Sequence, residues 1–178
     1  MVIRTPLGGA PVADYIGDVV FRRADSIDLD RLDTLEAYGR GSTQRAYVTK
    51  GHDALFVACH GDRIVATRRC SHEIRDPLAA RVVELGAGQI WGADIFCLPE
   101  YRSAGLGSRL VLFADRQLAS QRYTEVLAAV EADNISSLRL SLRKGSQFAC
   151  YVSYFRLLRY ERLRVHEELP RRLQARLK

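Results

Sequence analysis

Residues 94–108 read DIFCLPEYRSAGLGS, and this stretch decides the fold. An apolar strand leads through a proline-containing turn into Arg-x-x-Gly-x-Gly, which opens a helix. Gly105 and Gly107 let a bulky anion approach the main chain, because neither residue carries a Cβ. The free N–H groups of the first helical turn and the helix dipole favour negative charge at the same place. The segment therefore predicts a cradle for a pyrophosphate.

Two other interpretations of this segment compete with the cradle. A match to Arg-x-x-Gly-x-Gly alone is weakly specific, and an ordinary tight turn between a strand and a helix has the same pattern. A dinucleotide-binding Rossmann fold fits poorly, because its Gly-x-Gly-x-x-Gly fingerprint does not follow the first predicted strand. The position of the match between a strand and a helix favours the cradle.

The rest of the chain alternates strand-like and helix-like patterns, which predict a single mixed α/β domain in the order β–α–ββ–β–α–β–α–β. The expected strands are 19–23, 54–60, 63–70, 89–98, 124–130 and 148–158, with 81–85 as an optional further short strand; the order counts neither 81–85 nor the C-terminal helix. The expected helices are 27–38, capped by Asp25-Ser26, then 106–120, 134–144 and one that starts at Pro170. Residues 39–53 are expected to form a loop with a short helix at most. We divide the chain into an irregular arm (1–17), the main domain (18–166) and a basic amphipathic C-terminal helix (167–178).

Composition sets limits on the class of protein and on its location. The 178 residues are 47% hydrophobic and 27% charged, as expected for one domain with a core. No apolar run approaches the ~20 residues that span a bilayer, and the N-terminus lacks the apolar stretch of a secretory signal. We therefore expect a cytoplasmic protein with no membrane partner.

The net charge of +6 is concentrated at the C-terminal end. Residues 156–178 hold eight Arg or Lys and three Glu, so five of the six net positive charges lie there. A solvated helix face is the simplest explanation, and it leaves a homodimer or an acidic carrier protein open as partners. Nucleic acid is not favoured.

The cysteines do not indicate a disulfide framework or a metal site. The chain has four cysteines and no Cys-x-x-Cys pair, and Cys59, Cys97 and Cys150 stand in apolar runs typical of reduced core residues. Cys70-Ser71-His72 has no second ligand pair at zinc spacing, so no metal is expected.

The segment LPEYRSAGLGSRL resembles the central motif of the GNAT superfamily, which is Pro-x-Tyr-Arg followed by a glycine-rich loop and a helix. The order of predicted elements agrees over about residues 18–158. The resemblance implies a GNAT-type α/β domain, with a mixed central sheet flanked by helices and a splayed cofactor cleft. It also implies a CoA-dependent N-acyltransferase whose co-substrate is acetyl-CoA or another acyl-CoA.

The resemblance further implies which residues contact the cofactor. The main chain of Ile95, Phe96 and Cys97 is expected along the pantetheine and the acetyl carbonyl, at a bulge that splays this strand from the next. Asn134 matches an asparagine that contacts the cofactor, and it can cap its helix at the same time. The pyrophosphate loop comprises Arg102, Ser103, Ala104, Gly105, Leu106, Gly107 and Ser108.

The chain departs from the family where a general acid is expected. The family often places a tyrosine seven residues after that asparagine, and here the position is Ser141, whose hydroxyl is short and a poor acid. Tyr151 and Tyr154 on the next strand are alternative acids. A thiol with a pKa near ~8.5 also leaves without help. The change equally leaves open a different acyl donor or a non-catalytic protein.

A base is needed because only a neutral amine can attack the thioester. Asp94, three residues before Cys97 on the central strand, is the first candidate, with a structural hydrogen-bonding role as the alternative. Glu84 and His72 are weaker candidates.

The sequence thus predicts transfer of an acyl group, most simply acetyl, from CoA to a primary amine of a small molecule or peptide. The alternatives are a longer-chain N-acyltransferase that uses acyl-CoA or acyl carrier protein, and a non-catalytic CoA-binding module. No motif in 1–17 or 39–53 names the acceptor.

Overall fold

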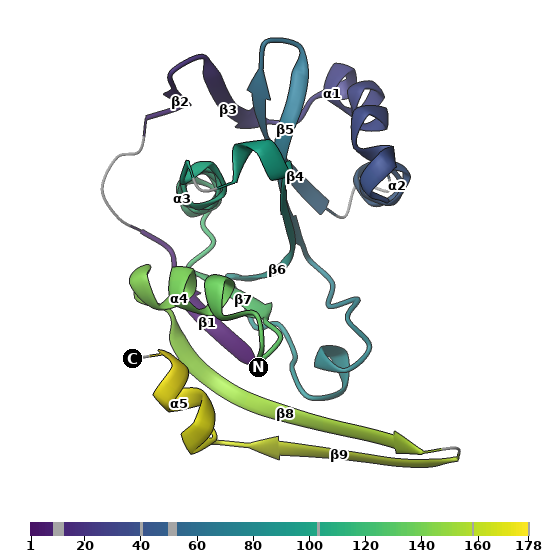
Figure 1. Ribbon diagram of the computed structural model, residues 1–178, viewed down its shortest axis with the longest axis vertical. Helices are drawn as coiled ribbons and strands as arrows, with labels where there is room; N and C mark the ends of the chain where they lie inside the picture. The colour runs from purple at the N-terminus through teal and green to yellow at the C-terminus, as the bar shows by residue number, and fades with distance from the viewer. Residues whose placement is uncertain (9–12, 40, 50–52, 103, 158, 178) are drawn as a thin grey trace.

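One sheet runs through the whole molecule in the strand order β2-β3-β4-β5-β6-β7-β1-β8-β9 (Figure 1). The computed structural model describes residues 1–8, 13–39, 41–49, 53–102, 104–157 and 159–177. The strands are β1 (Val2–Pro6), β2 (Tyr15–Ile16), β3 (Val19–Arg23), β4 (Asp53–His60), β5 (Arg63–Ser71), β6 (Gln89–Cys97), β7 (Glu125–Ala129), β8 (Gln147–Leu157) and β9 (Tyr160–His166). The helices are α1 (Ser26–Arg31), α2 (Gly41–Thr49), α3 (Leu106–Ser120), α4 (Ile135–Arg143) and α5 (Arg171–Leu177), with 3₁₀ turns at Leu32–Tyr38, Ala79–Arg81 and Pro99–Tyr101. The predicted mixed α/β domain is confirmed.

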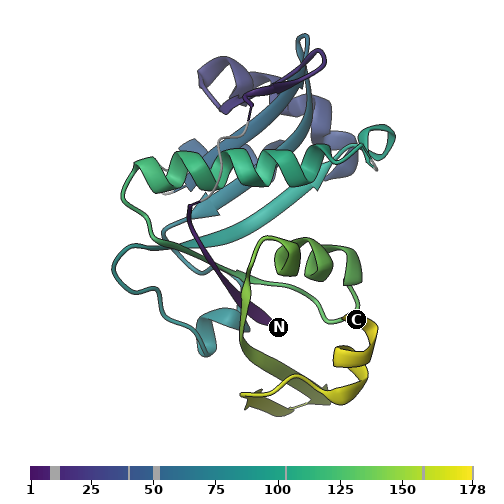
Figure 2. The same cartoon turned by 90° about the vertical axis from the view of Figure 1, so that its left-hand side faces the viewer.

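The two faces of the sheet carry different helices, because side chains alternate along each strand. Phe56 on β4 packs its ring edge-on against Phe113 of α3, so its cross-strand neighbour Arg68 also faces α3. The next residue, Thr67, faces the other way and accepts a hydrogen bond from Gln44 of α2. Helices α1 and α2 therefore cover one face, and α3 covers the other (Figures 1 and 2).

The sheet forks between β6 and β7. These two strands run parallel, and their pairing stops at Trp91 and Leu127. Strand β6 continues to Cys97 beside β5, with a bulge at Ala93 where the register with β5 shifts. A bulge bends its strand and disrupts the local pairing. The fork therefore lies where the splayed cleft was predicted.

Local sequence signals place most elements as expected. Asp25 caps α1 in a capping box with Asp28, since each side chain accepts a hydrogen bond from the other residue's main-chain N–H. The predicted helix 27–38 divides into α1 and a 3₁₀ turn. Gly61 adopts a positive φ of 56° in the tight turn between β4 and β5, as the predicted hairpin requires.

Four predictions about secondary structure were wrong or incomplete. Residues 2–6 do not belong to an irregular arm but form β1, because they pair with β7 on one side and β8 on the other. Residues 160–166 form β9, which pairs with β8 in a hairpin. This strand was not predicted, because its charged side chains interrupt the alternation of apolar and polar residues. Residues 81–85 form no strand; Val83 and Leu85 instead pack against Trp91. Helix α2 occupies most of the segment expected to be a loop.

Deleting residues 167–178 should lower the thermal midpoint of unfolding. Helix α5 lies against α4, and Leu173 is only 6% exposed. Burial of one leucine contributes about 2 kcal/mol. Its loss should lower the midpoint by roughly 4–8 °C in a chain of this size. Calorimetry would measure the shift, with Arg171→Ala, on the exposed side of α5, as the control that changes little.

The transfer to a small amine that the sequence predicts should persist in the deletion variant that stays folded. An unchanged midpoint together with a selective loss of activity from a carrier-bound donor would contradict this structural role and favour a carrier protein as partner.

Candidate active site

The glycine-rich loop ends at the N-terminus of α3, as predicted. Gly105 is the N-cap residue with a φ of 74°, a left-handed conformation that other residues rarely adopt. The Arg102 Nε donates a hydrogen bond to the carbonyl of Cys97, at 3.0 Å, which ties the loop to the end of β6. Ser103 lies outside the described residues. The first-turn N–H groups of α3 thus face the space beside β6 and α4.

That space is an outer cavity of about 580 Å³ between the loop and α4. It is lined by Ile95, Cys97, Tyr101, Arg102, Gly105, Leu106, Gly107, Ser108, Ser136, Ser137, Arg139, Leu140 and Arg143. Three of these residues are arginines, two of them on α4. A group with several negative charges, such as a nucleotide diphosphate, fits this lining. Arg139 and Arg143 were not among the site residues predicted from the sequence, although both stand on the predicted helix 134–144.

An inner cavity of about 300 Å³ occupies the fork of the sheet. Its lining includes Asp94 and Ile95 of β6, Val126 and Ala128 of β7, and Asn134, Ser137, Leu140 and Ser141 of the α4 segment. Ile95, Ser137 and Leu140 also line the outer cavity. The two cavities are therefore adjacent, and together they suit one long ligand with an anionic end at α3 and a narrow end in the fork.

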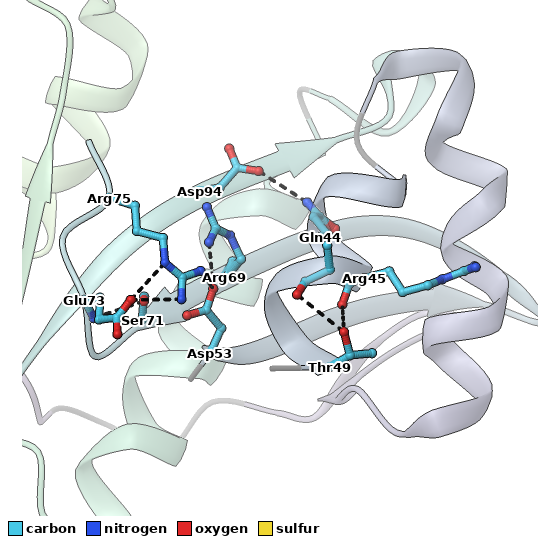
Figure 3. Close-up of polar contacts among 10 residues, drawn as sticks. Gln44, Arg45, Thr49, Asp53, Arg69, Ser71, Glu73, Arg75 and Asp94 are labelled. Carbon is cyan, nitrogen blue, oxygen red and sulfur yellow. Dashed lines mark hydrogen bonds and ion pairs between the residues drawn. The ribbon is translucent and has the colours of Figure 1, made fainter. Parts of the chain in front are cut away.

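Asp94 is held at the fork from the α2 face of the sheet (Figure 3). Gln44 of α2 donates through Nε2 to Asp94 Oδ2 at 3.3 Å and to Thr67 Oγ1 at 2.8 Å. Gln44 is 1% exposed, so its amide is fixed. The Asp94 carboxylate therefore has a defined orientation at the inner cavity. The residues of α4 line the opposite side of that cavity.

A second polar cluster lies beside Asp94 on the same face (Figure 3). Asp53 is buried at the start of β4 and pairs with Arg69 at 2.7 Å and with Arg75 at 3.4 Å. Glu73 pairs with the same Arg75 at 3.1 Å. These ion pairs fix the ends of β4 and β5 and the following loop. They make the α2 side of the fork polar.

Of the other candidate residues, Asn134 and Ser141 line the inner cavity, whereas Tyr151 lines a different one. The Asn134 side chain caps α4 by accepting from the Ser137 N–H at 3.1 Å, and the residue lines the inner cavity. Ser141 also lines it, but its hydroxyl donates to the carbonyl of Ser137 at 2.9 Å. Tyr151 lines a neighbouring cavity and packs against His166, so the structure does not bring it together with Asp94. Its role as a proton donor stays a prediction.

Phe96 and the weaker candidates lie off the two cavities. The Phe96 ring packs against Tyr38 on the α2 face, at 5.4 Å between centroids, which leaves only its main chain for the predicted contact. Glu84 is exposed, the His72 ring lies beside the Tyr123 hydroxyl, and Tyr154 belongs to the β8–β9 hairpin.

The cysteines have little nucleophilic character. Burial raises the pKa of the Cys97 thiol, so this residue at the cavity wall stays protonated at neutral pH. Cys59 is buried, as expected of a core residue, whereas Cys97 and Cys150 are only half-buried; Cys70, which was not assigned to the core, is buried as well. Among the described residues, no group of three or more His, Cys, Asp or Glu could hold a metal ion. None of the helices in the described part of the chain is long and apolar enough to cross a membrane.

Three buried charges were missed by the sequence analysis. Arg68 of β5 and Lys144 after α4 line the inner cavity, and Lys144 forms an ion pair with Asp115 of α3. Burial lowers the pKa of Lys144, while the carboxylate of Asp115 opposes that shift. One signal was available: Asp115 lies on the apolar side of α3, next to Leu118 and Val111 at helical spacing.

Comparison with solved structures shows the same fold. The aminoglycoside N-acetyltransferase AAC(6')-Iy in complex with CoA aligns with a TM-score of 0.59 at 16% identity, covering 77% of this chain and 98% of its own. The apo aminoglycoside 6'-N-acetyltransferase AAC(6')-IG of Acinetobacter haemolyticus gives 0.56 at 16% identity, covering 77% and 97%. A GCN5-related N-acetyltransferase of Sphaerobacter thermophilus gives 0.58 at 19% identity, covering 82% and 47%. At these identities the likeness concerns the fold alone.

Comparison by sequence gave two results. A search of curated proteins found no match. The model of the acetyltransferase (GNAT) family matches residues 23–145. This range contains the glycine-rich loop, the fork of the sheet and the helix capped by Asn134. It spans most of the chain, which therefore belongs to the GNAT family of acetyltransferases.

Proposed function

We propose that this protein transfers an acyl group from CoA to a primary amine, with acetyl-CoA as the simplest donor. The observation that carries the proposal is the succession of two adjacent cavities, from the N-terminus of α3 to the fork beside Asp94, which share Ile95, Ser137 and Leu140 as lining residues. A helix N-terminus with a glycine-rich loop suits a pyrophosphate. The fork is narrow enough for an acyl group.

The proposed binding mode follows the two cavities. The pyrophosphate lies on the main chain of Gly105–Ser108, and Arg102, Arg139 and Arg143 offer charge to the phosphates. The pantetheine runs between Ile95 and Leu140 into the fork. Asn134 and the main chain of Ile95 and Cys97 lie along this route.

The acceptor amine approaches from the α2 face in this proposal. Asp94, oriented by Gln44, takes a proton from the ammonium directly or through water. The neutral nitrogen attacks the thioester carbon, a C–N bond forms and the C–S bond breaks. The nitrogen then loses its second proton to solvent to give the amide, and the thiolate takes a proton from solvent. Similar structures include a CoA complex and an aminoglycoside acetyltransferase with sisomicin, which supports a CoA donor and a small amine-bearing acceptor.

A binding and turnover experiment tests the proposal. Purified protein is titrated with CoA by calorimetry, then incubated with acetyl-CoA and a panel of amino sugars, amino acids and lysine peptides. We expect CoA binding, release of free thiol, and acylated amines by mass spectrometry. An absence of CoA binding by folded protein would refute the proposal.

Replacing Ser141 by alanine should change kcat by less than about 3-fold. Its hydroxyl already donates to Ser137, and a serine hydroxyl is a poor acid, whereas a thiolate with a parent pKa near ~8.5 leaves readily. Steady-state rates with acetyl-CoA measure the effect. A loss above about 30-fold with unchanged CoA affinity would show that the proton reaches the leaving group through Ser141.

A further inference from the structure

The inner cavity contains a buried cation that the proposed reaction does not use. Arg68 on β5 lines this cavity and is 8% exposed. Its Nε is buried and has no hydrogen-bond partner. An arginine carries its charge at any physiological pH, and a buried charge requires a partner.

The guanidinium of Arg68 lies at the closed end of the fork, where β6 and β7 stop pairing. Gly92 is the first residue of β6 after the pairing with β7 stops. A Cβ at Gly92 would lie 2.5 Å from Nη2 of Arg68 and 3.0 Å from Val126. The glycine thus makes room for the guanidinium between the two diverging strands. A ligand that enters from the α3 side meets Arg68 at the end of its path.

The neighbouring charges leave Arg68 without a counterion in range. Lys144 is the partner of Asp115, and the Cys70 thiol, which shares a side-chain hydrogen bond with Arg68, stays uncharged because burial raises its pKa; the thiol is therefore no counterion. The other carboxylates of the cavity are Asp94, held by Gln44 on the α2 side, and Glu131, exposed at the rim. No carboxylate of the described residues lies within ion-pair distance of Arg68.

We infer that the acyl group of the donor carries a carboxylate, so that the preferred co-substrate is the CoA monothioester of a short dicarboxylic acid. This inference rests on the proposed function and specifies its donor. A guanidinium binds a carboxylate through paired hydrogen bonds. A cavity of about 300 Å³ holds an acyl group of a few carbon atoms.

The carboxylate belongs to the donor rather than to the acceptor because of the face on which Arg68 stands. Arg68 points to the side of α3, which also carries the cofactor path, whereas Asp94 and Gln44 occupy the α2 side. The amine attacks the thioester carbon and the CoA thiolate leaves, as for acetyl. The carboxylate stays on the transferred group, and the product is an amide with a terminal acid.

Two matched pairs of donors test this assignment in the absence of acceptor. Malonyl-CoA is compared with 3-methylbutanoyl-CoA, and succinyl-CoA with 4-methylpentanoyl-CoA; each pair has the same shape and differs in charge. Calorimetry with the full-length protein gives the four affinities and that of free CoA. At least one acid should bind about 10-fold or more tightly than its neutral partner.

Two variants complete the experiment. Arg68→Met keeps the length of the side chain and removes the charge, so the affinity ratio should fall to about one. Arg63→Met changes an exposed arginine at the other end of β5 and should keep the wild-type ratio. If Arg68→Met does not fold, the wild-type ratios alone decide.

The outcomes separate the two proposals. Normal binding of free CoA with ratios of one or less in both pairs would overturn the carboxylate assignment and leave acyl transfer standing. No binding of free CoA would remove both proposals.

Discussion

Asp94→Asn is expected to lower kcat/KM for acyl transfer by about 100-fold or more at neutral pH, the usual contribution of a general base. Asparagine keeps the shape of the side chain and an oxygen that can accept from Gln44, so the fork should stay intact. Only the proton acceptor is lost. Steady-state rates and a thermal midpoint measured on the same sample separate chemistry from stability.

The pH dependence gives a second measure of the same role. Without a base, the rate depends on the fraction of acceptor already neutral, which rises about tenfold per pH unit below an amine pKa near ~10.4. The deficit of Asp94→Asn should therefore shrink as the pH is raised. Glu84→Gln, which alters an exposed carboxylate away from both cavities, should match the wild type. A deficit of a few-fold that does not vary with pH would assign Asp94 a structural role.

Gly107→Leu is expected to weaken CoA binding by about 100-fold or more, the equivalent of losing two hydrogen bonds to charged groups. Gly107 lies in the first turn of α3 and lines the outer cavity. A Cβ there would make ordinary contact with Ile95 at 3.8 Å, but a leucine side chain would extend into the space assigned to the phosphates. Calorimetric titration with CoA measures the loss.

Misfolding does not explain a loss of CoA affinity in Gly107→Leu, because leucine favours a helix more than glycine does by roughly 0.8 kcal/mol. Gly107→Ala is the matched control: it adds only the tolerated Cβ and should bind CoA with an affinity closer to that of the wild type. Unchanged affinity in a folded Gly107→Leu protein would show that the anion binds elsewhere.

The elements that form the proposed cofactor side of the site could be predicted from the sequence, because they depend on local signals. Each of these features lies within one short stretch of sequence and is recognisable from residue type and spacing. The features are Gly105, the helix that follows it, and the cap at Asn134. The bulge beside Asp94 was expected from the resemblance to the family. The fold class followed from the same order of strands and helices.

Contacts between distant segments could not be predicted in this way. Arg68 stands in a run that looks like any strand, and only the sheet register places its guanidinium beside Gly92 at the fork. Gln44 reaches Asp94 from a segment that was expected to be a loop. Strand β1 (VIRTP) ends in a proline and leads into a segment rich in glycine and proline, and its pairing partners lie far along the chain.

The position of β1 has a consequence for the order in which the molecule assembles. Val2 pairs with Ala129 and Cys150, so β1 closes a loop that contains most of the chain. Contacts of such long sequence separation slow folding, because the entropy of loop closure opposes them. During translation β1 has no neighbour until β7 emerges from the ribosome. The half of the sheet beyond the fork must therefore form late, and until then the edges of β7 and β8 stay open to pairing with other chains.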